Sequence, residues 1–222
     1  MKRVTHNLYP WIYMTLSIAA TFAFFFLADY IFTTDLTQIQ TQIYNYMLTI
    51  QTPDLSKFLI LFTKTSNPVP ILIGTLTVCL LLFLKSYRME SLFVLFSILT
   101  LTFSNVLLKN HFSRERPPFE RLIEETGYSF PSGHSMMSFG IAILFAYLLF
   151  HLSRNRWIGS ILSLVGLCYT FTIGFSRIYV SVHYLGDVLG GYLAAISVTY
   201  PLIAFYEFLI KYTTLIKKRG SQ

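Results

Sequence analysis

Charged side chains are scarce in this chain of 222 residues, since Asp, Glu, Lys and Arg make up only 12% of it. Soluble domains carry about 25% charged residues, and their apolar share lies below the 54% found here. This composition excludes an ordinary soluble domain and predicts an integral membrane protein. Polar linkers, low-complexity tracts and internal repeats are also missing, which favours one domain over residues 1–222.

Cysteine is nearly absent as well. The two that occur, Cys79 and Cys168, both fall inside apolar runs and have no metal-type partner at close spacing. They therefore indicate no metal site, and we expect both to be buried as small apolar residues.

Long apolar runs dominate what is present. They lie at about 11–32, 69–84, 89–108, 134–150, 157–175 and 186–210, each near the ~20 residues that span a bilayer. The runs predict an all-α fold, a bundle of six transmembrane helices. The first run follows Lys2 and Arg3, but it is too long for a cleaved signal peptide, so we interpret it as a retained signal anchor.

The distribution of charge predicts the orientation. If both termini lie inside, the inner segments hold ten Lys or Arg against two acids, and the outer segments hold seven against eight. The positive-inside rule then places both termini in the cytoplasm of a multi-pass cell-membrane protein. Inner cations at helix ends are typical of contacts with anionic lipid headgroups, so the net charge of +7 does not indicate nucleic acid. No obligate protein partner is evident.

Residues 33–68 are the least regular part. Ile39, Ile43, Met47 and Ile50 recur at helical spacing with polar residues between them, which predicts an amphipathic helix on the outer interface. A short apolar stretch, 55–62, then runs into a break around Pro68 before the second long run. Two readings of 33–68 stay open: a passive loop, or a lid or ramp by which lipid reaches a site.

The first of three polar motifs is K-N-H-F-S-R-E-R-P, from Lys109 to Pro117. Two prolines follow Arg116 and hold its guanidinium group, which binds phosphate oxygens bidentately. Lys109 adds a compact positive charge at the membrane end of the segment. Arg114 and Arg121 have no partner motif, and we interpret them as interfacial anchors.

The second motif is P-S-G-H, residues 131–134. Pro and Gly predict a tight turn into the fourth span, where free peptide N–H groups form an anion site and Ser132 adds a hydroxyl donor. His134, at the rim of this site beside Gly133, is a candidate general acid.

The third motif, S-R-I-Y-V-S-V-H-Y-L-G-D, contains Arg177, His183 and Asp187. The histidine and the aspartate are four residues apart, so we expect them to share one face of a helix that enters the sixth span. A carboxylate that accepts from one imidazole nitrogen leaves the other as a directed nucleophile. The six-span layout brings all three motifs to the outer face.

Together, K-x6-R-P, P-S-G-H and S-R-x5-H-x3-D resemble the three-part signature of the type 2 phosphatidic acid phosphatase superfamily, with every position filled. The six-span layout is similar to that of phosphatidylglycerophosphatase B-like enzymes. The resemblance implies that His183, oriented by Asp187, attacks phosphorus and that His134 protonates the leaving oxygen. It implies a phosphoryl-binding set that comprises Lys109, Arg116, Ser132, Gly133 and Arg177. Since the three cations of this set, Lys109, Arg116 and Arg177, would face the phosphate, no divalent metal or other cofactor is expected.

The resemblance implies a metal-independent membrane lipid phosphatase that works through a phosphohistidine at the outer membrane face. Its expected substrates are phosphatidylglycerol phosphate or undecaprenyl pyrophosphate, with phosphatidic acid also accepted. Six spans argue against the soluble vanadium haloperoxidases, whose site is similar. Lipid phosphotransfer to another alcohol remains an alternative. An inactive lipid transporter or binding protein is disfavoured, because no signature residue is lost and no paired broken helices are visible.

Overall fold

The computed structural model describes residues 10–152 and 155–219. They form eight α-helices, and no strand occurs within these two ranges. The helices are α1 (Pro10–Thr33), α2 (Thr37–Ile50), α3 (Pro53–Lys64), α4 (Pro68–Leu84), α5 (Arg88–Phe112), α6 (Gly133–Leu152), α7 (Arg156–Tyr179) and α8 (Leu185–Arg219).

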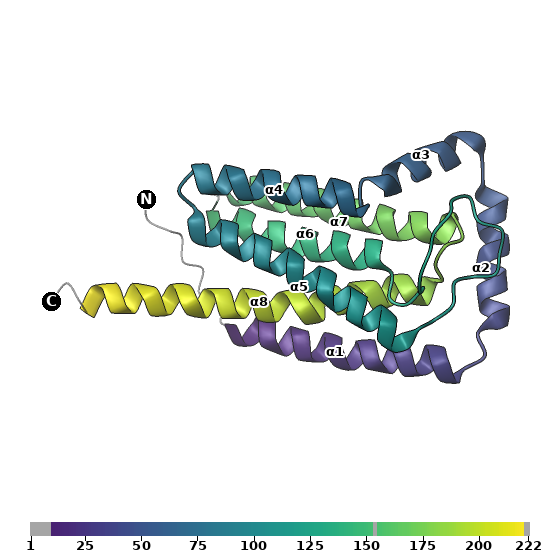
Figure 1. The fold of residues 1–222 in the computed structure, drawn as a ribbon, viewed down its shortest axis with the longest axis horizontal. Coiled ribbons are helices and arrows are strands. Elements are labelled where there is room, and N and C mark those ends of the chain that lie inside the picture. The colour runs from purple at the N-terminus through teal and green to yellow at the C-terminus, as the bar shows by residue number, and fades with distance from the viewer. Residues whose placement is uncertain (1–9, 153–154, 220–222) are drawn as a thin grey trace.

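Helices α1, α4, α5, α6, α7 and α8 run side by side in a bundle, and α2 lies across one end of it (Figure 1). Helix α6 is central, because it packs against α5, α7 and α8, while α1 packs along α8 and α4 along α5. Five helices are long and apolar enough to cross a membrane, and the bent pair of α3 and α4 makes a sixth candidate. The predicted all-α membrane bundle is therefore confirmed.

Many large apolar side chains lie on the surface of the bundle. Phe26 and Trp157, for example, are 76% and 80% exposed. Helices that are apolar on every side are stable in a bilayer, where lipid covers the outward faces. Cys168 is exposed on α7, and Cys79 is half-buried. Our expectation that both cysteines are buried was therefore wrong. An apolar run does not reveal which of its faces meets the protein and which meets lipid.

The region 33–68 contains two helices. Helix α2 has one buried residue, Met47, from the apolar face that the spacing predicted. Helix α3 begins at Pro53, where Thr52 Oγ1 accepts a hydrogen bond from the Leu55 peptide N–H (3.3 Å). A break of three residues and a bend of 51° separate α3 from α4, which begins at Pro68. Proline at a first helical position explains both starts.

Helix α5 extends beyond the apolar run 89–108 from which it was predicted. It continues to Phe112 and ends at Ser113, whose φ of 48° is left-handed. Lys109 therefore lies on the last turn of this helix and not in the following loop.

Candidate active site

The three motifs meet at the end of the bundle where α2 lies. The last turns of α5 and α7 and the first turns of α6 and α8 come together there (Figure 1). The connection 113–132 folds back over these helix ends, because the peptide N–H of Leu122 donates to Val180 O (3.2 Å) and that of Ser129 to Arg114 O (2.8 Å).

His183 and Asp187 lie side by side. Nδ1 of His183 is 3.4 Å from Oδ2 of Asp187. His183 precedes the first residue of α8, so our expectation of a shared helix face was wrong. A turn holds the pair instead: the peptide N–H of Tyr184 donates to the same carboxylate oxygen (2.9 Å). Ser129, which the sequence analysis did not identify, donates to this oxygen from Oγ and lies 3.3 Å from Nδ1.

The surroundings of His183 determine which ring nitrogen carries the proton. Nη1 of Arg116 lies 3.2 Å from Nε2. A guanidinium group only donates, so Nε2 accepts and the proton is on Nδ1, beside Asp187. Burial lowers the pKa of His183 to about 3, with contributions from Arg177 and Arg116 and against the opposite effect of Asp187. The ring is therefore neutral at physiological pH.

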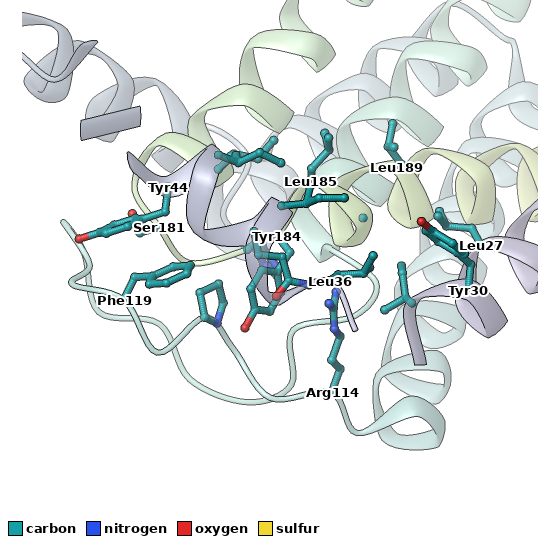
Figure 2. A pocket seen from close by; sticks show the side chains of 18 residues that line it. Leu27, Tyr30, Leu36, Tyr44, Arg114, Phe119, Ser181, Tyr184, Leu185 and Leu189 are labelled. Atoms are coloured by element: carbon teal, nitrogen blue, oxygen red, sulfur yellow. The ribbon is translucent and has the colours of Figure 1, made fainter. Parts of the chain in front are cut away.

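Arg114 also belongs to the site, which the sequence analysis did not anticipate. Its Nη1 donates to Oδ1 of Asp187, and its guanidinium carbon lies 4.3 Å from the centre of the Tyr184 ring. Figure 2 shows Arg114 reaching up toward Tyr184. The interpretation of Arg114 as an interfacial anchor was wrong, because its charge neutralises a carboxylate that is fully buried. Arg121, in contrast, bonds locally to Pro117 O (2.8 Å).

A cavity of about 490 Å³ opens beside His183, and Lys109, Arg116, Gly133 and His134 contribute to its lining. Arg116 is held in place by three carbonyl oxygens, since it donates to residues 126, 127 and 182 at 2.8, 2.9 and 3.0 Å. Burial lowers the pKa of Arg116, and the charge of Glu125 opposes this. Lys109 donates from Nζ to the Tyr128 carbonyl oxygen.

Arg177 is not among the residues that line this cavity; it is only 1% exposed and contacts Glu125, which does line it. Its Nη1 lies 3.1 Å from Thr63 Oγ1 on α3. Its Nη2 lies 3.1 Å from Oε1 of Glu125, and Arg116 Nη2 is 4.0 Å from the same oxygen. Glu125 comes from the connection 113–132 and was not identified from the sequence. A carboxylate thus lies where two of the predicted phosphate ligands meet.

The P-S-G-H segment starts α6 at Gly133, as expected. His134 Nε2 lies 2.8 Å from Oδ1 of Asn67, in the break between α3 and α4. Ser132 is fully buried and is not among the residues that line the cavity. Its peptide N–H donates to Asp187 O (2.9 Å), and its Oγ lies 3.0 Å from Ser135 Oγ. A role for Ser132 as a phosphate donor stays a prediction.

The cavity continues from these cations into the bilayer-facing part of the bundle. Leu72 on α4 and Leu99 and Val106 on α5 line it and are 56%, 60% and 50% exposed. One end is therefore cationic and the other is apolar and lies toward lipid.

A second, smaller cavity of about 190 Å³ reaches His183 from the side of α1, α2 and α8. Most of its lining is apolar, and the rings of Tyr44 and Phe119 stack at its edge with centres 4.2 Å apart (Figure 2). Its only arginine or lysine among the described residues is Arg114, which is already paired with Asp187. The first cavity is thus the one equipped to hold an anion.

The residues near His183 suit a phosphate group better than a metal ion. Within residues 10–152 and 155–219 no group of three His, Cys, Asp or Glu side chains is placed to hold a metal. Guanidinium and ammonium groups around a neutral imidazole can bind a phosphate dianion and present a nitrogen lone pair to it.

Comparison with known proteins agrees with this geometry. Phosphatidylglycerophosphatase B of Bacillus subtilis is 33% identical over 107 residues, which are 46% of this chain and 51% of that protein, so the match spans about half of the relative's length. Lipid A 4'-phosphatase of Bacteroides thetaiotaomicron is 30% identical over 171 residues, 70% of this chain and 72% of that protein.

The fold is shared with a solved structure. The crystal structure of a transmembrane phosphatidylglycerolphosphate phosphatase from Bacillus subtilis superposes with a TM-score of 0.81 at 25% identity, covering 86% of this chain and 96% of that one. The family model described as the PAP2 superfamily matches residues 90–211, which include all three motifs. The chain therefore belongs to the PAP2 superfamily, as its motifs indicated.

Proposed function

We propose that the protein is a metal-independent phosphatase of membrane lipids, formed by a single domain, that cleaves a lipid phosphate or diphosphate through a phosphohistidine. One observation carries the proposal. The unprotonated nitrogen of His183 lies beside Arg116 in a cavity that is cationic at this end and apolar where it meets the bilayer. Such a cavity suits an amphiphile whose phosphate lies at His183 and whose chains extend toward lipid.

The first chemical step is attack by Nε2 of His183 on phosphorus. The bond from phosphorus to the lipid oxygen breaks, and His134, which enters this step as an imidazolium, gives that oxygen a proton and becomes neutral. Asn67 accepts from Nε2 of His134 in the free enzyme and so holds the acid toward the cavity. Asp187 stabilises the positive charge that develops on the His183 ring, and the charge of Arg114 keeps Asp187 ionised.

In the second step water attacks the phosphohistidine. The bond from phosphorus to Nε2 breaks, inorganic phosphate leaves, and His134 takes the proton of the water, which restores both histidines. Lys109, Arg116 and Arg177 stabilise the phosphoryl charge in both steps, with the Gly133 peptide N–H and Ser132 as further donors. These groups supply the charge that a divalent metal supplies in other phosphatases.

The substrates that we propose are phosphatidylglycerol phosphate and undecaprenyl pyrophosphate, with phosphatidic acid as a further one. The relatives reported above are named for phosphate removal from glycerolipid or lipid A, and this supports a lipid phosphate as the shared element. We also propose that the active site faces the outside of the cell membrane and that both termini are cytoplasmic, from the asymmetry of Lys and Arg.

The test is phosphate release by the purified protein from these three lipids and from glycerol 3-phosphate, the phosphatidic acid headgroup without chains. We expect kcat/KM for phosphatidic acid to exceed that for glycerol 3-phosphate by about 100-fold or more, because binding energy from the chains lowers the barrier. Activity should be unchanged in EDTA. Equal rates on both phosphomonoesters, or activity that disappears in EDTA and returns with Mg²⁺, would contradict the proposal.

A further inference from the structure

A third cavity, with several polar side chains in its lining, lies between α1, α6 and α8, near the other end of the bundle from His183. Its volume is about 240 Å³. Side chains that carry polar groups dominate one wall: Tyr13, Tyr147, His151, Tyr200 and Glu207. No residue of the three motifs contributes to it, so it is separate from the candidate active site.

Glu207 is the charged group of this cavity. It lies on α8, and its side chain is 22% exposed. Its Oε1 accepts a hydrogen bond from the Tyr147 hydroxyl (2.7 Å) and lies 3.9 Å from Nδ1 of His151. Among the residues that the structure describes, no Lys or Arg is within ion-pair distance of it. A carboxylate in a membrane-spanning helix is costly, so such a residue by default indicates a functional site.

Three tyrosine rings line the same cavity as this carboxylate. The Tyr13 ring is 6.4 Å from that of Tyr147 at an interplanar angle of 87°, and 5.7 Å from that of Tyr200 at 65°. The rings of Tyr13 and Tyr200 thus meet at a steep angle in this cavity, whereas the Tyr147 ring stacks on His151 with centres 5.5 Å apart at 24°. The faces of aromatic rings attract cations, and an adjacent carboxylate adds to this attraction.

We propose that this cavity binds an alkylammonium group, such as the headgroup of an aminophospholipid. Its volume is below the roughly 300–1,000 Å³ of pockets for drug-sized ligands, so it fits one small cation and not a whole lipid. All three tyrosines are half-buried, which leaves the cavity open at the surface. The ammonium nitrogen lies against Glu207, and its substituents contact the rings of Tyr13 and Tyr200. In the rival arrangement, protonated His151 neutralises Glu207 and no ammonium compound binds.

The test measures thermal stabilisation of the purified full chain in detergent by three probes: lysophosphatidylethanolamine, free ethanolamine and lysophosphatidylglycerol. We expect saturable stabilisation by an ethanolamine compound and none of this kind by lysophosphatidylglycerol. Equal apparent affinities for the first two probes would identify the ammonium group alone as the ligand. Binding of the lysolipid only would identify a lipid headgroup.

Substitutions of residues that line this cavity test whether the ammonium group binds there. Glu207→Gln keeps an acceptor for Tyr147 and removes the charge, so the apparent Kd should rise about tenfold or more. Tyr200→Leu should weaken binding as well, whereas Tyr200→Phe, which keeps the ring, should not. Phosphate release should stay unchanged in all three variants, which separates this proposal from that for the active site. Absence of saturable binding, unchanged binding in Glu207→Gln, or equal effects of Tyr200→Leu and Tyr200→Phe would overturn it.

Discussion

At the scale of single residues, Glu125 brings a negative charge into the cavity that Lys109 and Arg116 line. Its carboxylate lies against Arg177 and near Arg116 and is 27% exposed. A phosphate dianion must displace this group or bind despite its repulsion. In the free protein, Glu125 thus occupies part of the space that a substrate phosphate needs. It also neutralises part of the positive charge that would bind this phosphate.

We predict that Glu125→Gln lowers KM for a lipid phosphate about two- to fivefold, which corresponds to the ~1 kcal/mol or less of a partly exposed ion pair. The amide keeps the shape of the side chain and removes the repulsion. Steady-state kinetics on phosphatidic acid measure the effect. Glu124→Gln, an exposed neighbour, is the matched control and should leave KM unchanged. An increase in KM for Glu125→Gln would instead show that the carboxylate assists binding.

The lowered pKa of His183 predicts that the free energy of unfolding depends on pH. Its pKa is lowered from 6.5 in the unfolded chain to about 3 in the folded protein. Below pH 6.5 the unfolded chain therefore binds a proton that the folded protein does not, and stability is lost as the pH falls toward 3. His183→Asn does not titrate.

We therefore expect the stability of the native protein relative to His183→Asn to decrease by about 1–2 kcal/mol between pH 7 and pH 5. Thermal unfolding of both proteins at the two pH values measures this difference. If the difference does not change with pH, or changes in the opposite direction, the imidazole is not held neutral by burial.

Several residues of the site could not be predicted from local sequence. The spacing of the motifs indicated His183, Asp187, Arg177 and Arg116, and the structure brings these together. Arg114 was misread because its partner, Asp187, is 73 residues away in the chain. Ser129, Glu125 and Asn67 were missed for the same reason: a folded loop or a helix break brings each of them to its partner, and no periodicity records that contact.

At the scale of helices, the break between α3 and α4 lies next to the candidate site. Thr63, at the end of α3, lies against Arg177, and Asn67, within the break, lies against His134. The prolines made the break predictable, and the amphipathic spacing did the same for α2. Which side chains the bend turns toward the site depends on how α3 packs against α7, and sequence spacing gives no measure of that.

The connections between helices test the proposed orientation. In a chain whose Cys79 and Cys168 are replaced by Ser, we expect a cysteine at Glu120 to react with an impermeant thiol reagent on intact cells. A cysteine at Ser86, in the exposed turn between α4 and α5, should react only after the membrane is opened. The reverse pattern would place the active site in the cytoplasm and exclude substrates of the outer leaflet.

At the scale of the whole molecule, the hydrophobic runs predicted the bundle well, because in a bilayer helices are the main way to satisfy every backbone hydrogen bond. Helix α4 alone, with 17 residues, is short for a span. The runs did not show that α3 completes it at an angle. The helix that lies across the end of the bundle, α2, was predicted by its amphipathic spacing and not by the runs. The result is a set of helix ends and turns that carries the candidate catalytic groups beneath the connection 113–132.

The central claim is that His183 is the nucleophile and His134 the general acid. The most direct measurement is transfer of labelled phosphate from an aryl phosphate to the protein, quenched in alkali because phosphohistidine is labile in acid. We predict that His183→Ala takes up no label. His134→Ala should accumulate labelled protein, since an aryl leaving group needs little protonation while attack by water lacks its base. Labelled histidine in His183→Ala, or no label in His134→Ala despite turnover, would contradict the account.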